Sequence, residues 1–396
     1  MKKLLALLLV AAMAFSVLAA CGDDGPTEPQ AIPESAPVNT PAPPPPPADD
    51  DDEPEEPVVM EVRDVRLASH NAVVEGNSFR IRYELDIQEA AAAAADHGFN
   101  VSYASFVANW DAALEVQQLQ NSINEGYDFI MVNPVSPTGL DPVIEQALDA
   151  GILYINCNNI YISPGAGIIN VGSNQFEQGY QTATYAGEIL GEGARVIMMA
   201  AREGNAASEL RQRGFERGIE EQGLVVVHES FHEWNDTLGG ELMLEILNSG
   251  IQFDGVLVSQ GADGILQAYE IANAPLPKFI GYHDSGVFMR QVIDANRDGH
   301  VMDFMVLNNS PGVGGTALNI GLHQMLGRVL RDDLFTDIWG PDVWAILLPN
   351  SIWFTYNDSW DGNDLDYYYA LGESLGTDVP SHWWDFESAG NTFFIP

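Results

Sequence analysis

Short apolar runs and longer amphipathic segments alternate along most of this chain, from about Val65 to Leu348. Continuous apolar runs are typical of strands buried on both faces of a parallel sheet, and apolar residues spaced three or four apart are typical of helices. The predicted strands are 65–69, 100–106, 127–133, 152–157, 195–200, 224–229, 255–259, 279–282, 301–307 and 343–348. The predicted helices are 78–97, 110–125, 140–150, 176–190, 208–221, 238–248, 264–273, 287–296 and 316–330. Repeated strand–helix units indicate an α/β fold with doubly wound parallel sheets, and two such series indicate two lobes.

Two of the predicted helices carry recognisable ends. Asn109 is a possible N-cap of helix 110–125, because its side chain can accept a hydrogen bond from a free backbone N–H group. Gly98 and Gly126 follow helices 78–97 and 110–125, and glycine readily adopts the left-handed conformation that ends a helix. These glycines therefore set the predicted ends of both helices.

The first 21 residues have a different pattern. Lys2 and Lys3 are followed by an apolar run over residues 4–17 and then by small residues before Cys21. This is the layout of a secretory signal peptide, and the ending Leu18-Ala19-Ala20-Cys21 resembles a bacterial lipobox. The resemblance implies a lipoprotein signal peptide over 1–20, cleavage before Cys21, and an extracytoplasmic protein anchored to the cell membrane by lipid on that cysteine. An ordinary signal peptide with a chance cysteine is the alternative.

Residues 21–57 lack the apolar side chains of a folded domain. They hold 12 of the 23 prolines and the acidic cluster Asp49–Glu53. Such a segment cannot bury enough apolar surface to offset the entropy of ordering, so we expect a disordered, semi-stiff tether. A metal site at the aspartate run is the weaker alternative, because its neighbours offer no fold to shape one.

The charge and the cysteine content of the chain exclude several kinds of partner and cross-link. The formal net charge is −41, and from Val58 onward 46 acidic residues face 14 basic ones, with Lys278 the only lysine after residue 3. Such a surface repels nucleic acid and anionic headgroups, so we expect no nucleic acid and no membrane contact beyond the lipid anchor. Cys157 is the only cysteine besides Cys21, so lipidation of Cys21 would leave no intrachain disulfide.

Polar and aromatic residues follow the predicted strands, where open α/β sheets bind their ligands. Amides donate and accept hydrogen bonds as hydroxyls do, aromatic faces cover the C–H face of a ring, and arginine offers a rigid fork of donors. This set fits a neutral polyol such as a sugar, and the chain lacks the glycine-rich phosphate loop of a nucleotide enzyme, so no cofactor is expected. The candidate ligand-binding residues are Asn77, Phe79, Asn133, Asn158, Asn159, Asn205, Arg211, Trp234, Gln260, His283, Asp284 and Asn309.

Each candidate also has a structural explanation. Asparagines near strand ends are often turn residues or helix caps, Trp234 could belong to a core, and Arg211 could form a surface ion pair. A separate stretch from Asp294 to Gly299 matches the start of a calcium loop, but Met305 stands where that loop needs a bidentate glutamate. A turn that ends a helix is the better interpretation there, and we expect no metal.

Several segments together resemble the type I periplasmic binding proteins, especially their ribose- and galactose-binding branch, over roughly residues 62–350. The resemblance implies two Rossmann-like lobes joined by a three-segment hinge, with crossings near 172–174, 309–311 and 340. It divides the chain into an N-terminal lobe of 58–172 plus 310–340, a C-terminal lobe of 173–309 plus 341–354, and an acidic aromatic extension over 355–396. The segments that carry it are Asn77-Ser78-Phe79, 128–134, 150–155, 211–215, Trp234-Asn235 and 306–309.

The resemblance also implies roles for individual residues. Phe79 and Trp234 fall on the positions that stack on the sugar ring, and Arg211 falls on the arginine of the binding site. The hydroxyl-binding amides fall on Asn77, Asn133, Gln260 and Asn309. Two places depart from the ribose branch: Asn158-Asn159 replaces an Asp-Arg pair, and Asp284 comes one residue late, after His283. These departures leave the identity of the sugar open.

The sequence therefore predicts a lipid-anchored, monomeric solute-binding protein, not an enzyme, that captures a monosaccharide or similar polyol and delivers it to an ABC permease. A ligand sensor of the same fold that serves a signalling partner is one alternative, and a nucleoside or sugar-like signal molecule is an alternative ligand. An extracellular carbohydrate-active enzyme is an alternative of another class. It would need paired carboxylates across the cleft, where only Asp284 and Glu203 stand near strand ends.

Overall fold

The protein is described here by a computed structural model that covers residues 62–162, 167–259, 263–283, 285–307, 309–336, 343, 345–348, 353–355 and 381–395. The predicted signal peptide, Cys21 and the tether lie outside these residues, and so do Gln260 and Asp284. The chain divides into the units Met1–Val58 and Val59–Pro396, and every described residue belongs to the second, compact unit. Within the described ranges, no helix is both long and apolar enough to cross a membrane.

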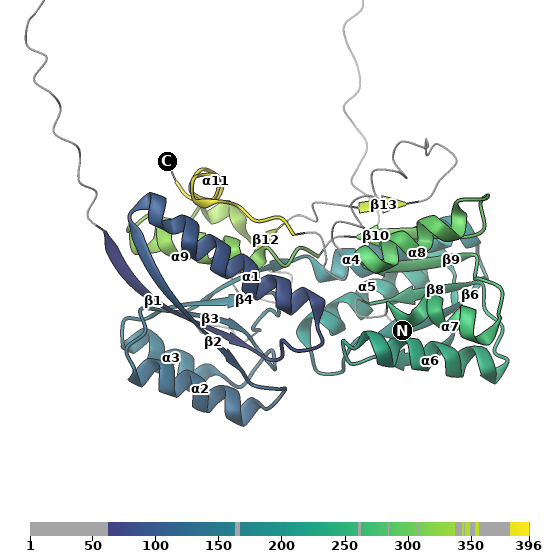
Figure 1. The fold of residues 1–396 in the computed structure, drawn as a ribbon, viewed down its shortest axis with the longest axis horizontal. Coiled ribbons are helices and arrows are strands. Elements are labelled where there is room, and N and C mark those ends of the chain that lie inside the picture. Colours follow the sequence, from purple (N-terminus) through teal and green to yellow (C-terminus); the bar gives the residue numbers. More distant parts are fainter. Residues whose placement is uncertain are drawn as a thin grey trace, which may run out of the picture. The chain divides into compact units, whose positions relative to one another are not determined.

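Lobe 1 is built on a seven-stranded sheet with the order β11-β12-β5-β4-β3-β1-β2 (Figure 1). Neighbouring strands are parallel except in the β11–β12 pair. The strands are β1 (Arg63–Asn71), β2 (Phe99–Val107), β3 (Phe129–Asn133), β4 (Leu153–Cys157), β5 (Ile169–Ser173), β11 (Phe335–Thr336) and β12 (Ala345–Leu348). One face is covered by α1 (Ser78–Ala93) and α9 (Val313–Met325), the other by α2 (Ala112–Asn124) and α3 (Asp141–Asp149).

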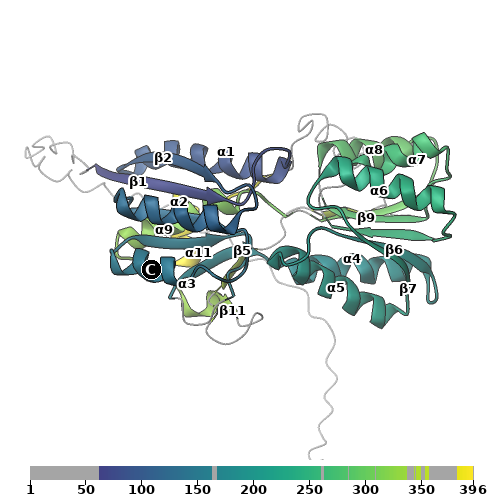
Figure 2. The same cartoon turned by 90° about the horizontal axis from the view of Figure 1, so that it is seen from below.

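Lobe 2 has a six-stranded sheet with the order β13-β10-β9-β8-β6-β7 (Figure 2). Only β13 runs antiparallel to its neighbour, β10. The strands are β6 (Arg195–Ala200), β7 (Val225–Phe231), β8 (Gly255–Val258), β9 (Phe279–His283), β10 (Asp303–Leu307) and β13 (Trp353–Thr355). Helices α4 (Gln175–Leu190) and α5 (Ala206–Gln222) cover one face, and α6 (Asp236–Ser249), α7 (Gly264–Ala272) and α8 (Gly286–Asn296) cover the other. The predicted pair of doubly wound parallel α/β lobes is thus confirmed.

Asparagine side chains begin many of these helices. Each accepts a hydrogen bond from a backbone N–H group in the first turn, as the side chains of Asn77, Asn174, Asn205 and Asn235 do. The prediction that Asn109 caps the second helix is wrong, because Asp111 caps α2. Asn109 and Trp110 precede it with positive φ angles of 50° and 63°. A cap needs an extended backbone, which Asp111 has and Asn109 does not.

Two helices cover the lobe that does not contain the preceding strand. Helix α4 follows β5 of lobe 1 but packs on α5 of lobe 2, and α9 follows β10 of lobe 2 but packs beside α1 of lobe 1. The chain therefore passes to lobe 2 between Ser173 and Gln175 and returns between Leu307 and Val313.

The third passage differs from the prediction. Residues 341–354 were expected in the C-terminal lobe, but strand β12 pairs with β5 in the sheet of lobe 1, with Ala345 opposite Asn170. Strand β13 joins the other sheet, so the chain crosses between Leu348 and Trp353 rather than near Gly340. A short apolar strand carries no local signal for the sheet that it joins, which explains the error.

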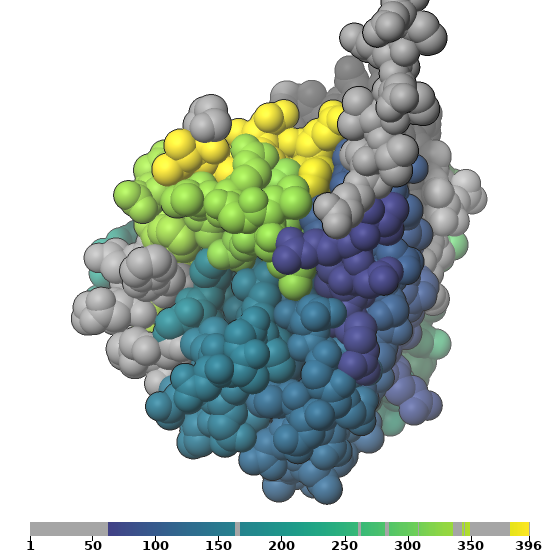
Figure 3. All heavy atoms as spheres, turned by 90° about the vertical axis from the view of Figure 1, so that its left-hand side faces the viewer, coloured from purple at the N-terminus to yellow at the C-terminus, as the bar shows by residue number. Residues whose placement is uncertain are grey.

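The last described segment, residues 381–395, lies on lobe 1. Figure 3 shows it in yellow against α9 in light green. The side-chain amide of Asn319 in α9 donates to the carbonyl oxygen of Trp384 at 2.8 Å, and helix α11 (Phe386–Phe393) packs on α9. Phe386 stacks on the rings of His97 and His323. The described part of the predicted 355–396 extension is thus a cover for lobe 1.

Replacing Gly179 by alanine should lower the free energy of unfolding by about 2 kcal/mol. The added Cβ atom would lie 2.0 Å from the carbonyl oxygen of Arg211 in α5, so the two helix backbones would have to separate. Urea unfolding of Gly179→Ala and the parent protein measures the difference.

Glu188→Ala is the control in the same helix. Glu188 is exposed and alanine favours the helix, so this variant should unfold at the urea midpoint of the parent protein or slightly above it. Equal urea midpoints for Gly179→Ala and the parent protein would contradict the close packing of α4 on α5.

Candidate functional site

The carboxyl ends of the parallel strands carry several of the predicted site residues. Asn133 is the last residue of β3, and Asn158 and Asn159 directly follow β4. In lobe 2, Trp234 follows β7, and His283 ends β9, although its side chain lies outside the described part. Because parallel strands end at one edge of a sheet, each lobe collects its polar candidates along that edge.

Several buried side chains at these strand ends have no internal hydrogen-bond partner. Within the described residues, this holds for both amide atoms of Asn133, for Oδ1 of Asn158 and for Nε1 of Trp234. All three side chains are less than a tenth exposed. A buried polar atom without a partner costs about 1–3 kcal/mol, so such atoms are rare in folded proteins. These groups are therefore available to a polar ligand in both lobes.

A buried network that includes Arg80 contacts the end of β3 in lobe 1. Its guanidinium donates to Oδ1 of Asn71 and to the carbonyl oxygen of Asn133, the latter at 3.4 Å. Asn71 donates in turn to Glu84 at 2.6 Å. Burial lowers the pKa of Arg80 to about 10, against the opposing charges of Glu115 and Glu84. Arg80 therefore stays charged at neutral pH and fixes the strand end that carries Asn133.

Glu115 is a second buried carboxyl group of lobe 1. It lies in the first turn of α2, is 1% exposed, and accepts a hydrogen bond from the backbone N–H group of Val135 at 3.0 Å. Burial raises its pKa to about 7, although that hydrogen bond and the charge of Arg80 act in the other direction. The carboxyl group is therefore partly protonated at neutral pH.

Arg211 is tied to two of the segments that connect the lobes. Its guanidinium donates to Oε1 of Gln175, the first residue of α4, and Nε2 of Gln175 donates to Oδ1 of Asn309 at 3.0 Å. All three side chains are at least 97% buried. A ligand that contacts Arg211 would therefore be linked by hydrogen bonds to Gln175 at the first passage between the lobes and to Asn309 at the second.

An aromatic group lies beside Arg211. The Cζ atom of Arg211 is 5.6 Å from the ring centroid of Trp234, within the range of a cation–π interaction. His232 meets Trp234 edge-on, with ring centroids 6.3 Å apart. Burial, helped by the charge of Arg211, lowers the pKa of His232 to about 3, so its ring is neutral. A flat indole, a neutral imidazole and a fixed guanidinium suit a ring that carries hydroxyl groups.

Four other predicted residues are occupied within the fold. Phe79 is 3% exposed and belongs to the apolar core that α1 and α9 share. Asn77 and Asn205 use Oδ1 as helix caps. Asn159 donates to the carbonyl oxygen of Pro134 at 3.1 Å. The caps at Asn77 and Asn205 match the structural explanation given for asparagines, and any ligand role for the four residues stays a prediction.

The model of the periplasmic binding protein domain matches residues 73–328 of this chain. The chain belongs to this family. A protein of Rhizobium meliloti assigned as rhizopine-binding is 30% identical over 235 residues, which cover 57% of this chain and 74% of the relative. The resemblance drawn from the sequence is thus confirmed.

Solved structures place this periplasmic binding protein in the type I fold. The solute-binding protein of an ABC transporter from Bacillus halodurans C-125, with bound myo-inositol, has a TM-score of 0.61 at 21% identity and covers 78% of this chain and 98% of its own. The fructose-binding periplasmic domain of a hybrid two-component system has a TM-score of 0.62 at 15% identity and covers 78% and 95%. At these identities, the likenesses show the fold but do not identify the ligand of this chain.

Sequence reasoning missed three residues of the binding protein that contact the candidates. They are Arg80, Trp110 and Gln175. Arg80 and Gln175 lie in helices that also bury other polar side chains, such as Glu84 in α1 and Gln178 in α4, so no pattern in a single sequence marks them. Trp110 had a signal: Asn109-Trp110-Asp111 after β2 resembles Glu233-Trp234-Asn235 after β7, and both end in a helix cap.

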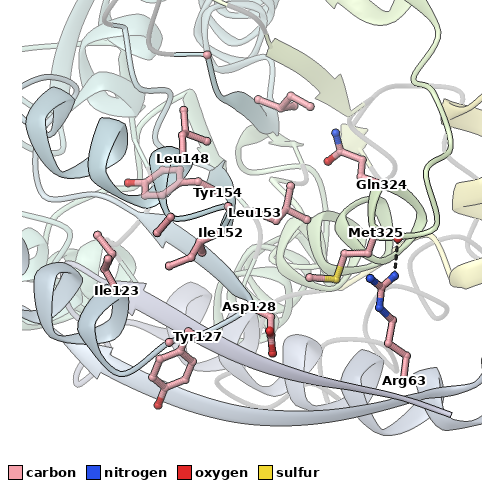
Figure 4. A pocket seen from close by; sticks show the side chains of 15 residues that line it. Arg63, Ile123, Tyr127, Asp128, Leu148, Ile152, Leu153, Tyr154, Gln324 and Met325 are labelled. Carbon is pink, nitrogen blue, oxygen red and sulfur yellow. Dashed lines mark hydrogen bonds between the residues drawn. The ribbon is translucent and has the colours of Figure 1, made fainter.

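One cavity in the described part of the binding protein lies away from these residues. It measures about 770 Å³ and is lined at the amino ends of the lobe 1 strands by Arg63, Asp128 and Leu153, among others (Figure 4). Arg63 donates to the carbonyl oxygen of Met325, and Asp128 accepts from the backbone N–H group of Arg66 at 2.8 Å. Its charged groups are thus already paired, which makes it a poorer polyol site than the strand ends.

The calcium-like stretch is a helix-ending turn. Oδ1 of Asn296, the last residue of α8, accepts hydrogen bonds from the backbone N–H groups of Val301 and Met302 at 2.9 and 3.1 Å. Asp294 forms an ion pair with Arg297 at 3.3 Å. The amide of Asn296 therefore closes the turn with its own backbone partners.

Proposed function

We propose that this periplasmic binding protein captures a monosaccharide or a similar cyclic polyol between its lobes and delivers it unchanged to an ABC permease. In this proposal, the lipid on Cys21 anchors the chain at the outer face of the membrane, and the proline-rich tether gives it reach. The protein acts as a monomer, because each lobe supplies half of one site.

The unpartnered buried atoms at the strand ends carry the proposal. Both amide atoms of Asn133 and the indole N–H group of Trp234 lack partners within the described residues, and they belong to different lobes. An amide that must both donate and accept fits a hydroxyl group, which does the same. The indole face adds the flat apolar area that covers the C–H face of a ring.

The relatives support the same class of ligand. The Rhizobium meliloti relative is assigned as rhizopine-binding, and the Bacillus halodurans structure of the same fold holds myo-inositol. The sequence departures at Asn158 and Asn159 remove an ionic pair that the ribose branch has. A site that relies on amides and arginine therefore favours an uncharged ring with many hydroxyl groups.

Ligand capture is a shift between lobe arrangements. A polyol that binds Asn133 in lobe 1 and Trp234 in lobe 2 stabilises the closed arrangement by the free energy of the contacts made only there. Arg211 links ligand contact to the passages through Gln175 and Asn309. The closed arrangement is then the form that the permease recognises.

The described carboxyl groups favour binding over hydrolysis. Glycoside hydrolysis needs two carboxyl groups on either side of the scissile bond. The buried Glu84 and Glu115 both belong to lobe 1, and each accepts hydrogen bonds within that lobe. Asp236 and Asp263 both belong to lobe 2, where the backbone N–H group of Asp263 donates to Asp236.

A thermal unfolding screen tests the proposal. The compact unit Val59–Pro396 is heated with ribose, allose, arabinose, fructose, xylitol, myo-inositol and nucleosides. A ligand at a hundredfold excess over its Kd adds about 2.7 kcal/mol of stability, and Trp234→Ala should weaken binding by about 2 kcal/mol.

Trp384→Ala is the control, because Trp384 lies in the C-terminal segment on α9. It should lower the melting temperature equally with and without ligand. No shift with any of the compounds would contradict the polyol proposal.

A sensor of the same fold is the second candidate, favoured by the likeness to the periplasmic domain of the two-component system. Reconstitution with the permease encoded beside its gene distinguishes the two: ligand-dependent ATP hydrolysis supports delivery, and its absence supports a sensor.

A further inference from the structure

Two turns in equivalent places of the lobes share an unusual backbone. Among the described residues, only six that are not glycine have positive φ, and four of them form the consecutive pairs Asn109-Trp110 and Glu233-Trp234. Strands β2 and β7, which precede these turns, are the edge strands next to β1 and β6. Left-handed backbone is costly for such residues and clusters where function holds it in place. Each lobe therefore presents one tryptophan at the same strand end.

The ring of Trp110 contacts the other lobe. Its ring packs against the buried cluster of Ala201, Ala207 and Trp234, all of lobe 2. The Cζ atom of Arg202, also of lobe 2, lies 4.5 Å from the ring centroid of Trp110, within cation–π range.

Both partners of the Trp110–Arg202 contact are also held by residues of their own lobes. Arg202 forms an ion pair with Glu233, the neighbour of Trp234, and both side chains are about a third to two-fifths exposed, at 34% and 42%. On the lobe 1 side, the Cζ atom of Arg80 lies 5.3 Å from the ring centroid of Trp110. The indole is thus held by one arginine from each lobe, at the rim of the strand ends.

We propose that Trp110 is a positioning residue for ligand retention: through Arg202 it fastens the two lobes together once they have closed. The proposal rests on the proposed function, in which the lobes close on a ligand. Because the Trp110–Arg202 contact joins different lobes, it exists only while the lobes meet, and its free energy is added to the closed arrangement alone. Its main consequence is a slower release of the ligand.

The test compares Trp110→Ala, Trp110→Phe, Arg202→Ala and the double variant Trp110→Ala/Arg202→Ala. Stopped-flow measurements on the best polyol of the thermal screen should give a dissociation rate about tenfold higher for Trp110→Ala, corresponding to about 1.4 kcal/mol, with little change in the association rate. Arg202→Ala should have a similar effect, and the double variant should be no worse than either single one. Trp110→Phe should keep part of the retention, since a smaller aromatic ring still faces the guanidinium.

Arg217→Ala is the matched control. Arg217 also forms ion pairs on lobe 2, and both partners lie on its own helix: Glu220 at 3.7 Å and Glu221 at 2.5 Å. Its dissociation rate should equal that of the parent protein. Additive effects of Trp110→Ala and Arg202→Ala, or a change confined to the association rate, would overturn the proposal.

A second readout needs no ligand and so separates this proposal from the proposed function. Spin labels at Glu145→Cys in α3 and Glu245→Cys in α6, both exposed, report the distance between the lobes. The buried Cys157 stays unlabelled. Trp110→Ala and Arg202→Ala should lower the share of short, closed distances that the parent protein shows without ligand, even if no polyol binds. An equal share of short distances in the parent protein and both variants would overturn the proposal.

Discussion

Replacement of Arg211 by methionine should raise the Kd of the bound polyol by about a hundredfold or more. Removing one member of a buried, charged hydrogen-bonding group costs about 2–5 kcal/mol, and each 1.4 kcal/mol corresponds to a factor of ten in Kd. Arg211 lies beside Trp234 and donates to Gln175, so the variant loses the donor that the proposed function assigns to the ligand, together with the link to the passages between the lobes. Titration calorimetry on the ligand found in the thermal screen measures the change.

The control for this variant is Arg217→Met on the same helix. Arg217 is 55% exposed and pairs with Glu221, so its loss should leave the Kd within about twofold of the parent value. If Arg211→Met and Arg217→Met bound the polyol equally well, Arg211 would have no role in the site.

Glu115→Gln should make the protein more stable at neutral and alkaline pH but not at pH 4.5. The folded state raises the pKa of Glu115 from its ordinary 4.5 to about 7, so the folded chain holds this proton more tightly than the unfolded chain. Stability is therefore lost as the pH rises from 4.5 to 7, by roughly 3 kcal/mol at 1.36 kcal/mol per pKa unit. Glutamine keeps the acceptor for Val135 and has no proton to lose.

Urea unfolding at pH 4.5, 6 and 7.5 measures this effect as the gap between the free energies of unfolding of Glu115→Gln and the parent protein. The contributions of the other titrating groups cancel in this difference, because both proteins contain them. His232 is one of them, and its lowered pKa makes stability rise with pH, opposite to the effect of Glu115. Glu125→Gln, an exposed position just beyond the same helix, should run parallel to the parent protein. A gap that stays constant between pH 4.5 and 7.5 would contradict the raised pKa of Glu115.

The sequence predicted the parts of the fold that depend on local patterns. Helix 78–97 was predicted as one helix: the α-helix ends at Ala93, and the 3-10 helix Ala94–His97 continues it to Gly98, which closes it in the left-handed conformation. Strand Arg195–Ala200 has the predicted bounds, because its apolar run is covered on both faces. Strands β5, β11 and β13 were missed: β5 contains Asn170 and Gly172, β11 is two residues long and β13 three, so none shows a continuous apolar pattern.

The candidate site depended on relations that a single sequence does not show. Asn133 and Trp234 stood out because they follow clear strands. Gln175 did not, because its importance comes from lying between Arg211 and Asn309, residues far away in the chain. Trp110 was assigned to a helix because the positive φ of its turn leaves no mark in composition.

The exchange of α4 and α9 between the lobes bears on the order of folding during export. The parallel strands of lobe 2, β6 to β10, and its helices α4 to α8 form one continuous stretch, so this lobe can assemble as soon as that stretch has crossed the membrane. Lobe 1 cannot, because the apolar face of its sheet is covered by α9 and α11. Although lobe 1 comes first in the sequence, it is completed last, and until then its uncovered apolar face is open to aggregation.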